Sequence, residues 1–144
     1  MDKILEDLKK LKTIFHDTET VKLGDSLEVE LAPISSEEET EAHAFALQHE
    51  QGLAYIYSVK RETVARSIIK INGKELPEYI EEDNGETLQR YAWLKKNIIS
   101  GWNQMLIDKI WLGYSNLLNR LEVKINGETL VEKENSKENE QEEV

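Results

Sequence analysis

The chain contains no cysteine, only two prolines and only three histidines among its 144 residues. Without cysteine it can form no disulfide and hold no metal through thiolates, and a reducing compartment is natural for it. No segment approaches the roughly 20 apolar residues that span a bilayer. The first residues also lack the apolar stretch and small-residue cleavage site of a secretory signal. We therefore expect a soluble, intracellular protein with no membrane partner.

Basic residues are also few, because 18 lysines and arginines stand against 29 aspartates and glutamates and give a net charge of -11. A nucleic-acid-binding surface needs a basic stripe that neutralises phosphates. Lys9, Lys10 and Lys12 are separated by apolar residues and preceded by acids, so we interpret them as the polar face of a short helix. The composition therefore argues against a nucleic-acid partner.

Residues 1–17 are predicted to form a short amphipathic helix. Its apolar residues recur at spacings of three and four and make a single stripe, consisting of Ile4, Leu5, Leu8, Leu11, Ile14 and Phe15. A helix of about four turns is marginal alone. It must dock on its own domain or on a partner, and we expect the former.

Residues 18–131 are expected to form one domain. Thr20–Leu23 and Leu27–Leu31 flank Gly24-Asp25-Ser26, a tight turn, so they are predicted to form a hairpin. In the second arm Leu27, Val29 and Leu31 alternate with two glutamates, which indicates a half-buried strand with one acidic face.

A helix is predicted after Pro33, which cannot continue strand pairing. Ser35 or Ser36 caps it, and Glu39 stands three residues after Ser36, as a capping box requires. The glutamates at positions 37–39 also lie where the helix dipole favours carboxylates. The acidic cluster therefore needs no binding site to explain it, and Gly52 is expected to interrupt the helix.

A second helix is predicted from Leu53 to Arg66, with Ile56, Val59 and Val64 facing inward. Residues 67–72 then alternate as a strand, and Asn72-Gly73 is a strong turn signal. A long helical region follows over residues 86–121. Ser100-Gly101 in its middle predicts a kink or a break into two packed helices.

The segment VKINGETL at positions 123–130 echoes IKINGKEL at positions 69–76. Both are predicted to be a strand with a turn, able to pair with the first hairpin in one small sheet. The helices before the two segments match poorly, so we interpret the similarity as convergence on a sequence that favours a hairpin and not as an internal duplication. Residues 132–144 are acidic and contain no apolar residue before Val144, and they are predicted to be disordered. The fold class is thus α+β: a mainly helical domain with a small antiparallel sheet and an acidic tail.

No constellation of catalytic residues is present. Glu39 and His43 could share a helix face, but His49 lies too far around the helix to join them, and His16 is a helix-end histidine. The chain has no phosphate-binding glycine loop, no H-E-x-x-H and no nucleophile motif. We therefore predict no metal, no cofactor and no enzymatic activity.

Trp93, Trp102 and Trp111 are spaced by nine residues, so on one continuous helix successive tryptophans would fall on opposite faces. They share one core only if the break at Ser100-Gly101 reorients the chain. We interpret them as core or partly buried residues, with an exposed partner-binding tryptophan as the alternative. Our candidate partner-binding residues are Trp102, Trp111, Tyr114 and Leu118.

Between Val21 and Leu121 the chain resembles the baseplate hub assembly proteins and tail assembly chaperones of long-tailed, T4-like bacteriophages. The resemblance rests on the segment VKLGDSLEVELAPISSEEETEAHAFA, on an IKINGKELP-type strand after a helix, on Arg90 with Leu94, and on Tyr114 with Leu117. It implies a non-enzymatic protein that binds another tail component, such as the tape-measure protein or a hub subunit. Its place would be the host cytoplasm or the virion tail.

Two other functions stay open. The protein could be a permanent structural subunit of the tail or baseplate. It could instead be a regulatory or inhibitor protein whose acidic face mimics nucleic acid. Self-association is also left open by the sequence.

Overall fold

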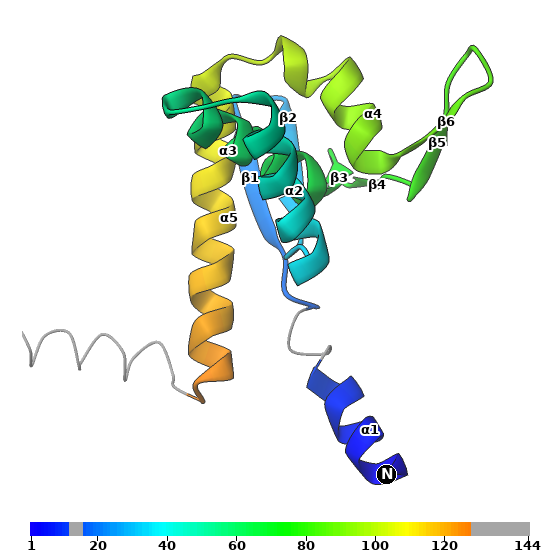
Figure 1. Cartoon of the computed structure of the whole chain (residues 1–144), viewed down its shortest axis with the longest axis vertical. Coiled ribbons are helices and arrows are strands. Elements are labelled where there is room, and N and C mark those ends of the chain that lie inside the picture. The colour runs from blue at the N-terminus through cyan, green and yellow to red at the C-terminus, as the bar shows by residue number, and fades with distance from the viewer. Residues whose placement is uncertain (12–15, 128–144) are drawn as a thin grey trace, which may run out of the picture.

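The computed structural model describes residues 1–11 and 16–127 and shows an α+β fold (Figure 1). Within these residues, five α-helices accompany a four-stranded and a two-stranded antiparallel sheet. The helices are α1 (Asp2–Lys10), α2 (Ser36–His49), α3 (Leu53–Ser67), α4 (Arg90–Asn97) and α5 (Gln104–Ile125), and a 3-10 turn, η2 (Ile99–Gly101), follows α4. The expected acidic tail lies outside the described residues.

The larger sheet has the strand order β1-β2-β3-β4, formed by β1 (Glu19–Leu23), β2 (Leu27–Leu31), β3 (Ile68–Ile71) and β4 (Lys74–Glu75). The predicted first hairpin is confirmed with Val21 opposite Val29. The turn at Asn72-Gly73 is also confirmed. Asn72 takes a positive φ of 50°, which asparagine tolerates, and its side chain accepts a hydrogen bond from the Glu28 N–H.

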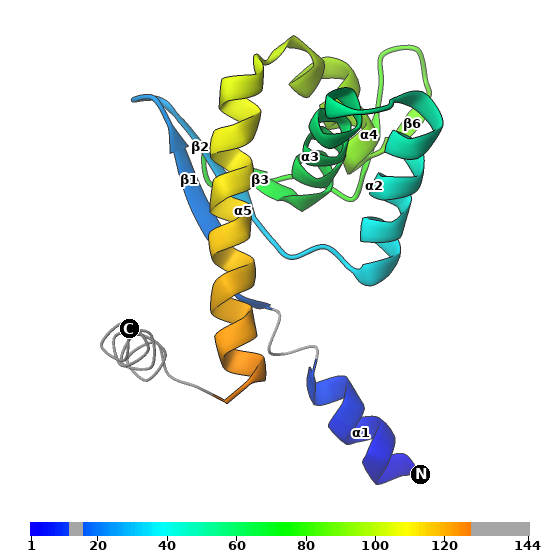
Figure 2. The same ribbon diagram turned by 60° about the vertical axis from the view of Figure 1, so that its left-hand side comes forward.

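One core lies between this sheet and the helices α3, α4 and α5. Buried Val21, Val29 and Leu31 from the strands meet Ile68, which begins β3 directly after α3. Buried residues of α5 complete the core, namely Ile107, Ile110, Tyr114, Leu117 and Leu121. Figure 2 shows α5 lying across the hairpin of β1 and β2, with α3 on its other side. Gly113 permits this approach, since a Cβ there would collide with Val21.

The predicted helix break at Ser100-Gly101 is confirmed, because η2 and Trp102 separate α4 from α5. The start of the predicted helical region is wrong. Residues 87–89 form β6 (Thr87–Gln89), which pairs with β5 (Tyr79–Glu81) in a separate two-stranded sheet. The Asp83-Asn84-Gly85 segment is therefore the turn of this hairpin rather than a boundary before a helix.

Three further predictions need correction. The capping box of α2 uses Ser35 with Glu38, in place of Ser36 with Glu39. Ile56 is exposed rather than inward. The segment from Val123 to Ile125 continues α5 as a helix rather than forming a strand. The cause is that the helical stripe of α5 runs through Leu121 and outweighs the local strand pattern.

Helix α1 does not dock on the described part of its own domain. None of its residues is buried, and Ile4, Leu5, Leu8 and Leu11 are each half exposed or more. Ile14 and Phe15 lie outside the described residues. Figure 2 shows α1 extending away from the body below the C-terminal end of α5.

Candidate functional site

A buried cluster of charges connects α3 to α4. The side chain of Glu62 is 1% exposed, and one of its oxygens accepts hydrogen bonds from Lys95 at 2.8 Å and from Arg66 at 3.0 Å. The Lys95 ammonium also lies 2.7 Å from the second oxygen, although without the geometry of a hydrogen bond. Arg66 stacks over the ring of Tyr91 at 4.0 Å. Lys95 stacks over the ring of Phe45 at 3.9 Å and thereby ties α4 to α2.

The charges in this cluster compensate one another, so it is scaffold rather than a reactive site. An uncompensated carboxylate at this depth would be very costly, and the two cations make the burial tolerable. The sequence carried a signal for it that we did not use. Glu62 and Arg66 stand four residues apart on α3, and such a pair can form an ion pair on a helix.

A polar pocket of about 470 Å³ opens beside this cluster, at the N-terminal end of α2. It is lined by Glu37, Glu38, Glu41, Arg66, Glu78, Gln89, Arg90 and Tyr91. Several of these groups already have partners. Glu38 accepts a hydrogen bond in the capping box, and Arg90 donates to the carbonyl of Leu76 at 3.1 Å. The acidic residues after Ser35 therefore serve the helix end, as the sequence predicted.

The histidines of α2 have structural partners. His43 lies 2.9 Å from the hydroxyl of Tyr55 through its Nδ1, and this contact joins α2 to α3. His49 packs on the ring of Phe45 with a centroid separation of 4.4 Å. Within residues 1–11 and 16–127, no group of three or more histidine, aspartate or glutamate side chains is arranged to hold a metal ion.

The aromatic residues of the α4–α5 region face the core more than the solvent. Trp93, Trp102 and Trp111 are all partly buried and pack against the core cluster. The interpretation of the tryptophans as core or partly buried residues is thus confirmed, and the helix break provides the reorientation that this requires.

Tyr114 must be removed from the candidate partner-binding residues. It is 5% exposed, and its hydroxyl accepts a hydrogen bond from the Ile34 N–H at 3.3 Å. Burial raises the pKa of its phenol, and the nearby Glu39 and Glu38 raise it further. Of the four candidates, Leu118 alone is exposed, at 43%. The apolar surface available to a partner therefore lies mostly elsewhere.

One exposed apolar surface on the described body is the tip of the α2–α3 hairpin. Leu47 at the end of α2 and Leu53 at the start of α3 are 68% and 69% exposed, and Ile56 follows on the same helical face as Leu53. Together they line an open hollow of about 810 Å³, with Glu50 at its rim. We call Leu47, Leu53 and Ile56 the tip patch.

Glycine creates this geometry. Gly52 has a positive φ of 64°, which lets the chain reverse between the two helices within a few residues. α2 buries only Ala42 and Ala46, and Leu47 and the turn that follows it are exposed. The sequence indicated the break at Gly52, but it gave no direct sign that Leu47, Leu53 and Ile56 would meet on one exposed surface.

Helix α1 is a second exposed apolar surface, and it lies at the other end of the molecule. Figures 1 and 2 show the α2–α3 turn at the same height as the N-terminal end of α5, and α1 beyond the C-terminal end of α5. The segment that leads from α1 into β1 is anchored on α5. Arg120 pairs with Glu19 at 2.7 Å and donates to the Thr18 carbonyl at 2.9 Å, and Lys124 pairs with Asp17.

None of the described helices combines the length and apolarity that crossing a membrane requires. No protein-family model matches the chain, and no curated protein or solved structure matches it either.

Proposed function

We propose that this chain is a non-enzymatic binding protein of bacteriophage tail or baseplate assembly. In this proposal it holds an apolar helix of another tail component, such as the tape-measure protein or a hub subunit, against the tip patch. Two observations support the proposal. One is the exposed tip patch at the turn between α2 and α3, and the other is the resemblance to tail assembly proteins given above.

The tip patch is the main support for the proposal. Single exposed leucines are ordinary, but three large apolar side chains around one hollow are typical of a surface that a partner covers. The hollow is wide and open, as suits the face of an amphipathic helix. Glu50 at the rim and the net charge of -11 favour a helix whose apolar face is bordered by lysines or arginines.

The direct test is co-expression with the tape-measure and hub proteins of the same phage. We expect a complex with one of them, or a higher soluble yield of that protein. Leu53→Asp should abolish either effect. Because Leu53 is the first residue of α3, an aspartate there suits the helix end and leaves the fold intact. Leu112→Asp, at a similarly exposed leucine of α5, is the matched control. Retention of binding by Leu53→Asp would refute the assignment of the tip patch.

The alternative of a permanent tail subunit uses the same surface and differs only in the fate of the protein. Mass spectrometry of purified virions separates the two, since an assembly chaperone is missing from the finished particle and a subunit is present.

The structure gives the nucleic-acid-mimic alternative less support than the sequence did. On the β1–β2–β3 face, Glu28 lies opposite Lys22, and Glu30 pairs with Lys70 at 3.4 Å. A continuous acidic face is therefore not formed there.

A further inference from the structure

We infer that α1 docks on α5 of a second copy of this chain, so that two copies form a dimer by exchanging their N-terminal helices. The surface that receives α1 is the flank of α5 made by Trp111, Leu118 and Ile125. The dimer uses neither the tip patch nor its partner, so it is independent of the proposed function.

The receiving flank is apolar and open. Trp111, Leu118 and Ile125 are spaced by seven residues and therefore lie along one side of α5. Trp111 is partly buried, while Leu118 and Ile125 are exposed at 43% and 57%. The helices and strands that pack most extensively on α5 are α3 and β1, and they leave this flank uncovered along the C-terminal half of the helix.

The apolar stripe of α1 has a matching period. Ile4, Leu8 and Leu11 are separated by four and three residues, so Ile4 and Leu11 are also seven apart. Two helices whose apolar residues share this spacing can interlock along their length. The apolar residues of α1 are exposed, as are Leu118 and Ile125 on α5, and all of them would lose water contact in one interface.

The charges of α1 and α5 permit contact between them in two copies of an acidic chain. The whole chain carries -11, so two copies repel each other over most of their surfaces. Helix α1 has three acidic and three basic residues and no net charge, and α5 has two acidic and three basic residues and a net charge of +1. An interface between α1 and α5 therefore joins two elements of an acidic protein that do not repel each other.

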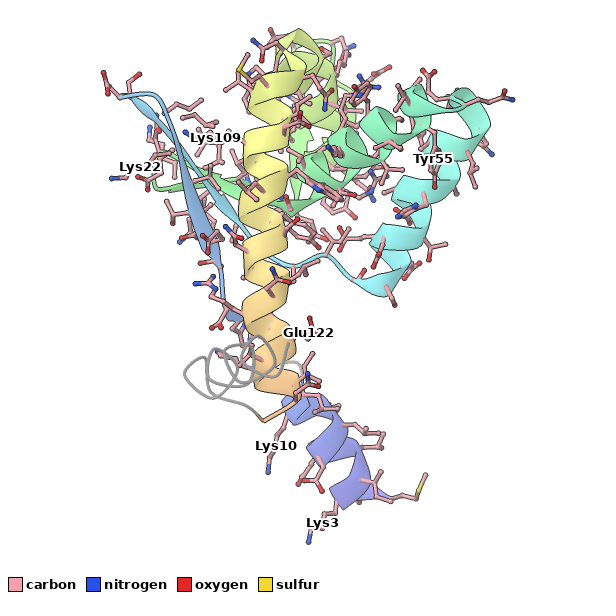
Figure 3. The ribbon with its side chains drawn as sticks, turned by 90° about the vertical axis from the view of Figure 1, so that its left-hand side faces the viewer. Lys3, Lys10, Lys22, Tyr55, Lys109 and Glu122 are labelled. Carbon is pink, nitrogen blue, oxygen red and sulfur yellow. The ribbon has the colours of Figure 1, made fainter. Side chains whose placement is uncertain are left out.

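The position of α1 favours exchange over folding back. The ion pairs of Glu19 and Asp17 hold the chain against the C-terminal half of α5, and α1 continues outward from that end (Figure 3). Helix α1 points away from its own body, as a helix does when it packs on another copy. When each of two copies packs its α1 on the other, no further copy can join, and the assembly is a dimer.

The absence of cysteine gives a clean cross-linking test. Leu8→Cys and Leu118→Cys are made as separate variants, purified, mixed and mildly oxidised. We expect a covalent dimer from the mixture and much less from either variant alone. Only contact between copies can join these two positions in the mixture. Equal cross-linking in all three samples, or none, would overturn the proposal. The proposal would also be overturned if the double variant Leu8→Cys with Leu118→Cys formed its disulfide only within one chain.

Sedimentation velocity over a range of protein concentrations provides the second readout. The unaltered chain should sediment as a dimer. Leu8→Asp and Leu118→Asp should each raise the dimer dissociation constant by about 100-fold or more, because each change occurs twice in a symmetric interface. The control is Leu112→Asp, an equally drastic change that lies about 120° away from Leu118 around α5 and should leave the dimer intact. A monomer at all concentrations would contradict the proposal.

Discussion

Replacing Glu62 by glutamine should strongly destabilise the protein, although the two side chains have nearly the same volume. Glu62 is the shared acceptor of Lys95 and Arg66, and the Arg66 side chain is only 4% exposed. Glutamine keeps one acceptor oxygen but removes the negative charge. Arg66 is then a buried cation with no adequate counter-charge, since the carboxylate of Glu41 lies 3.9 Å away and is half exposed.

The expected cost follows from this burial. Removing one member of a buried ion pair costs about 3–5 kcal/mol. The lower end of that range applies here, because Lys95 is 23% exposed and can turn toward water when the carboxylate is lost. We expect Glu62→Gln to lower the free energy of unfolding by about 3 kcal/mol. For a chain of this size that is a fall of roughly 10 °C in Tm.

The assay is chemical unfolding followed by circular dichroism, with Glu30→Gln as the control. Glu30 forms a more exposed pair with Lys70, so its loss should cost about 1 kcal/mol or less. The double variant Glu62→Met with Arg66→Met should be more stable than Glu62→Gln, since it removes the uncompensated cation as well. Equal effects of Glu62→Gln and Glu30→Gln would refute the account of the buried cluster.

Three further outcomes are expected from single changes. Gly113→Ala should lower the free energy of unfolding by about 1 kcal/mol in a denaturant titration, because the clash with Val21 outweighs the better helix propensity of alanine. A stabilised variant would contradict the close packing of α5 on β1. Ser35→Ala should cost about 1 kcal/mol in the same assay through loss of the capping box with Glu38, whereas Ser36→Ala should not. The raised pKa of Tyr114 means that the folded state holds the phenol proton more tightly than the unfolded state does. The free energy of unfolding should therefore fall as pH rises above about 10. Tyr114→Phe should show a smaller fall, and an identical pH profile would argue against burial of this hydroxyl.

Much of the fold was predictable where local signals agree with the packing. The first hairpin has alternating apolar residues around a turn, and α3 and β3 meet at a change from helical to alternating periodicity before Asn72-Gly73. In these segments the local preference and the buried face point to the same structure. The break before α5 was predictable for a similar reason, since Ser100-Gly101 is a poor helix interior.

The errors arose where tertiary packing decides between two local preferences. The segment VKI at positions 123–125 alternates as a strand does, but it continues a helix whose buried stripe includes Leu121. Residues 79–81 and 87–89 were missed because each strand has only three residues, too few for periodicity to identify.

The candidate site was harder to predict than the fold. Trp102, Trp111 and Tyr114 were named as candidate partner-binding residues because of their residue type. The structure shows that α5 turns Tyr114 toward the core and that both tryptophans are partly buried. The tip patch depends on Leu47 from one helix meeting Leu53 and Ile56 from the next, across a turn whose shape the spacing of apolar residues does not specify.

Hydrogen exchange of the protein alone and with its tail partner tests the central proposal most directly. The tape-measure and hub proteins of the same phage are the partners to use, each added in excess and compared with the Leu53→Asp variant. The account predicts slower amide exchange over residues 47–57 in the presence of one of them, with the turn at Gly24 unchanged and no effect on the variant. Unchanged exchange over residues 47–57 with every tail component, or protection confined to other segments, would contradict it.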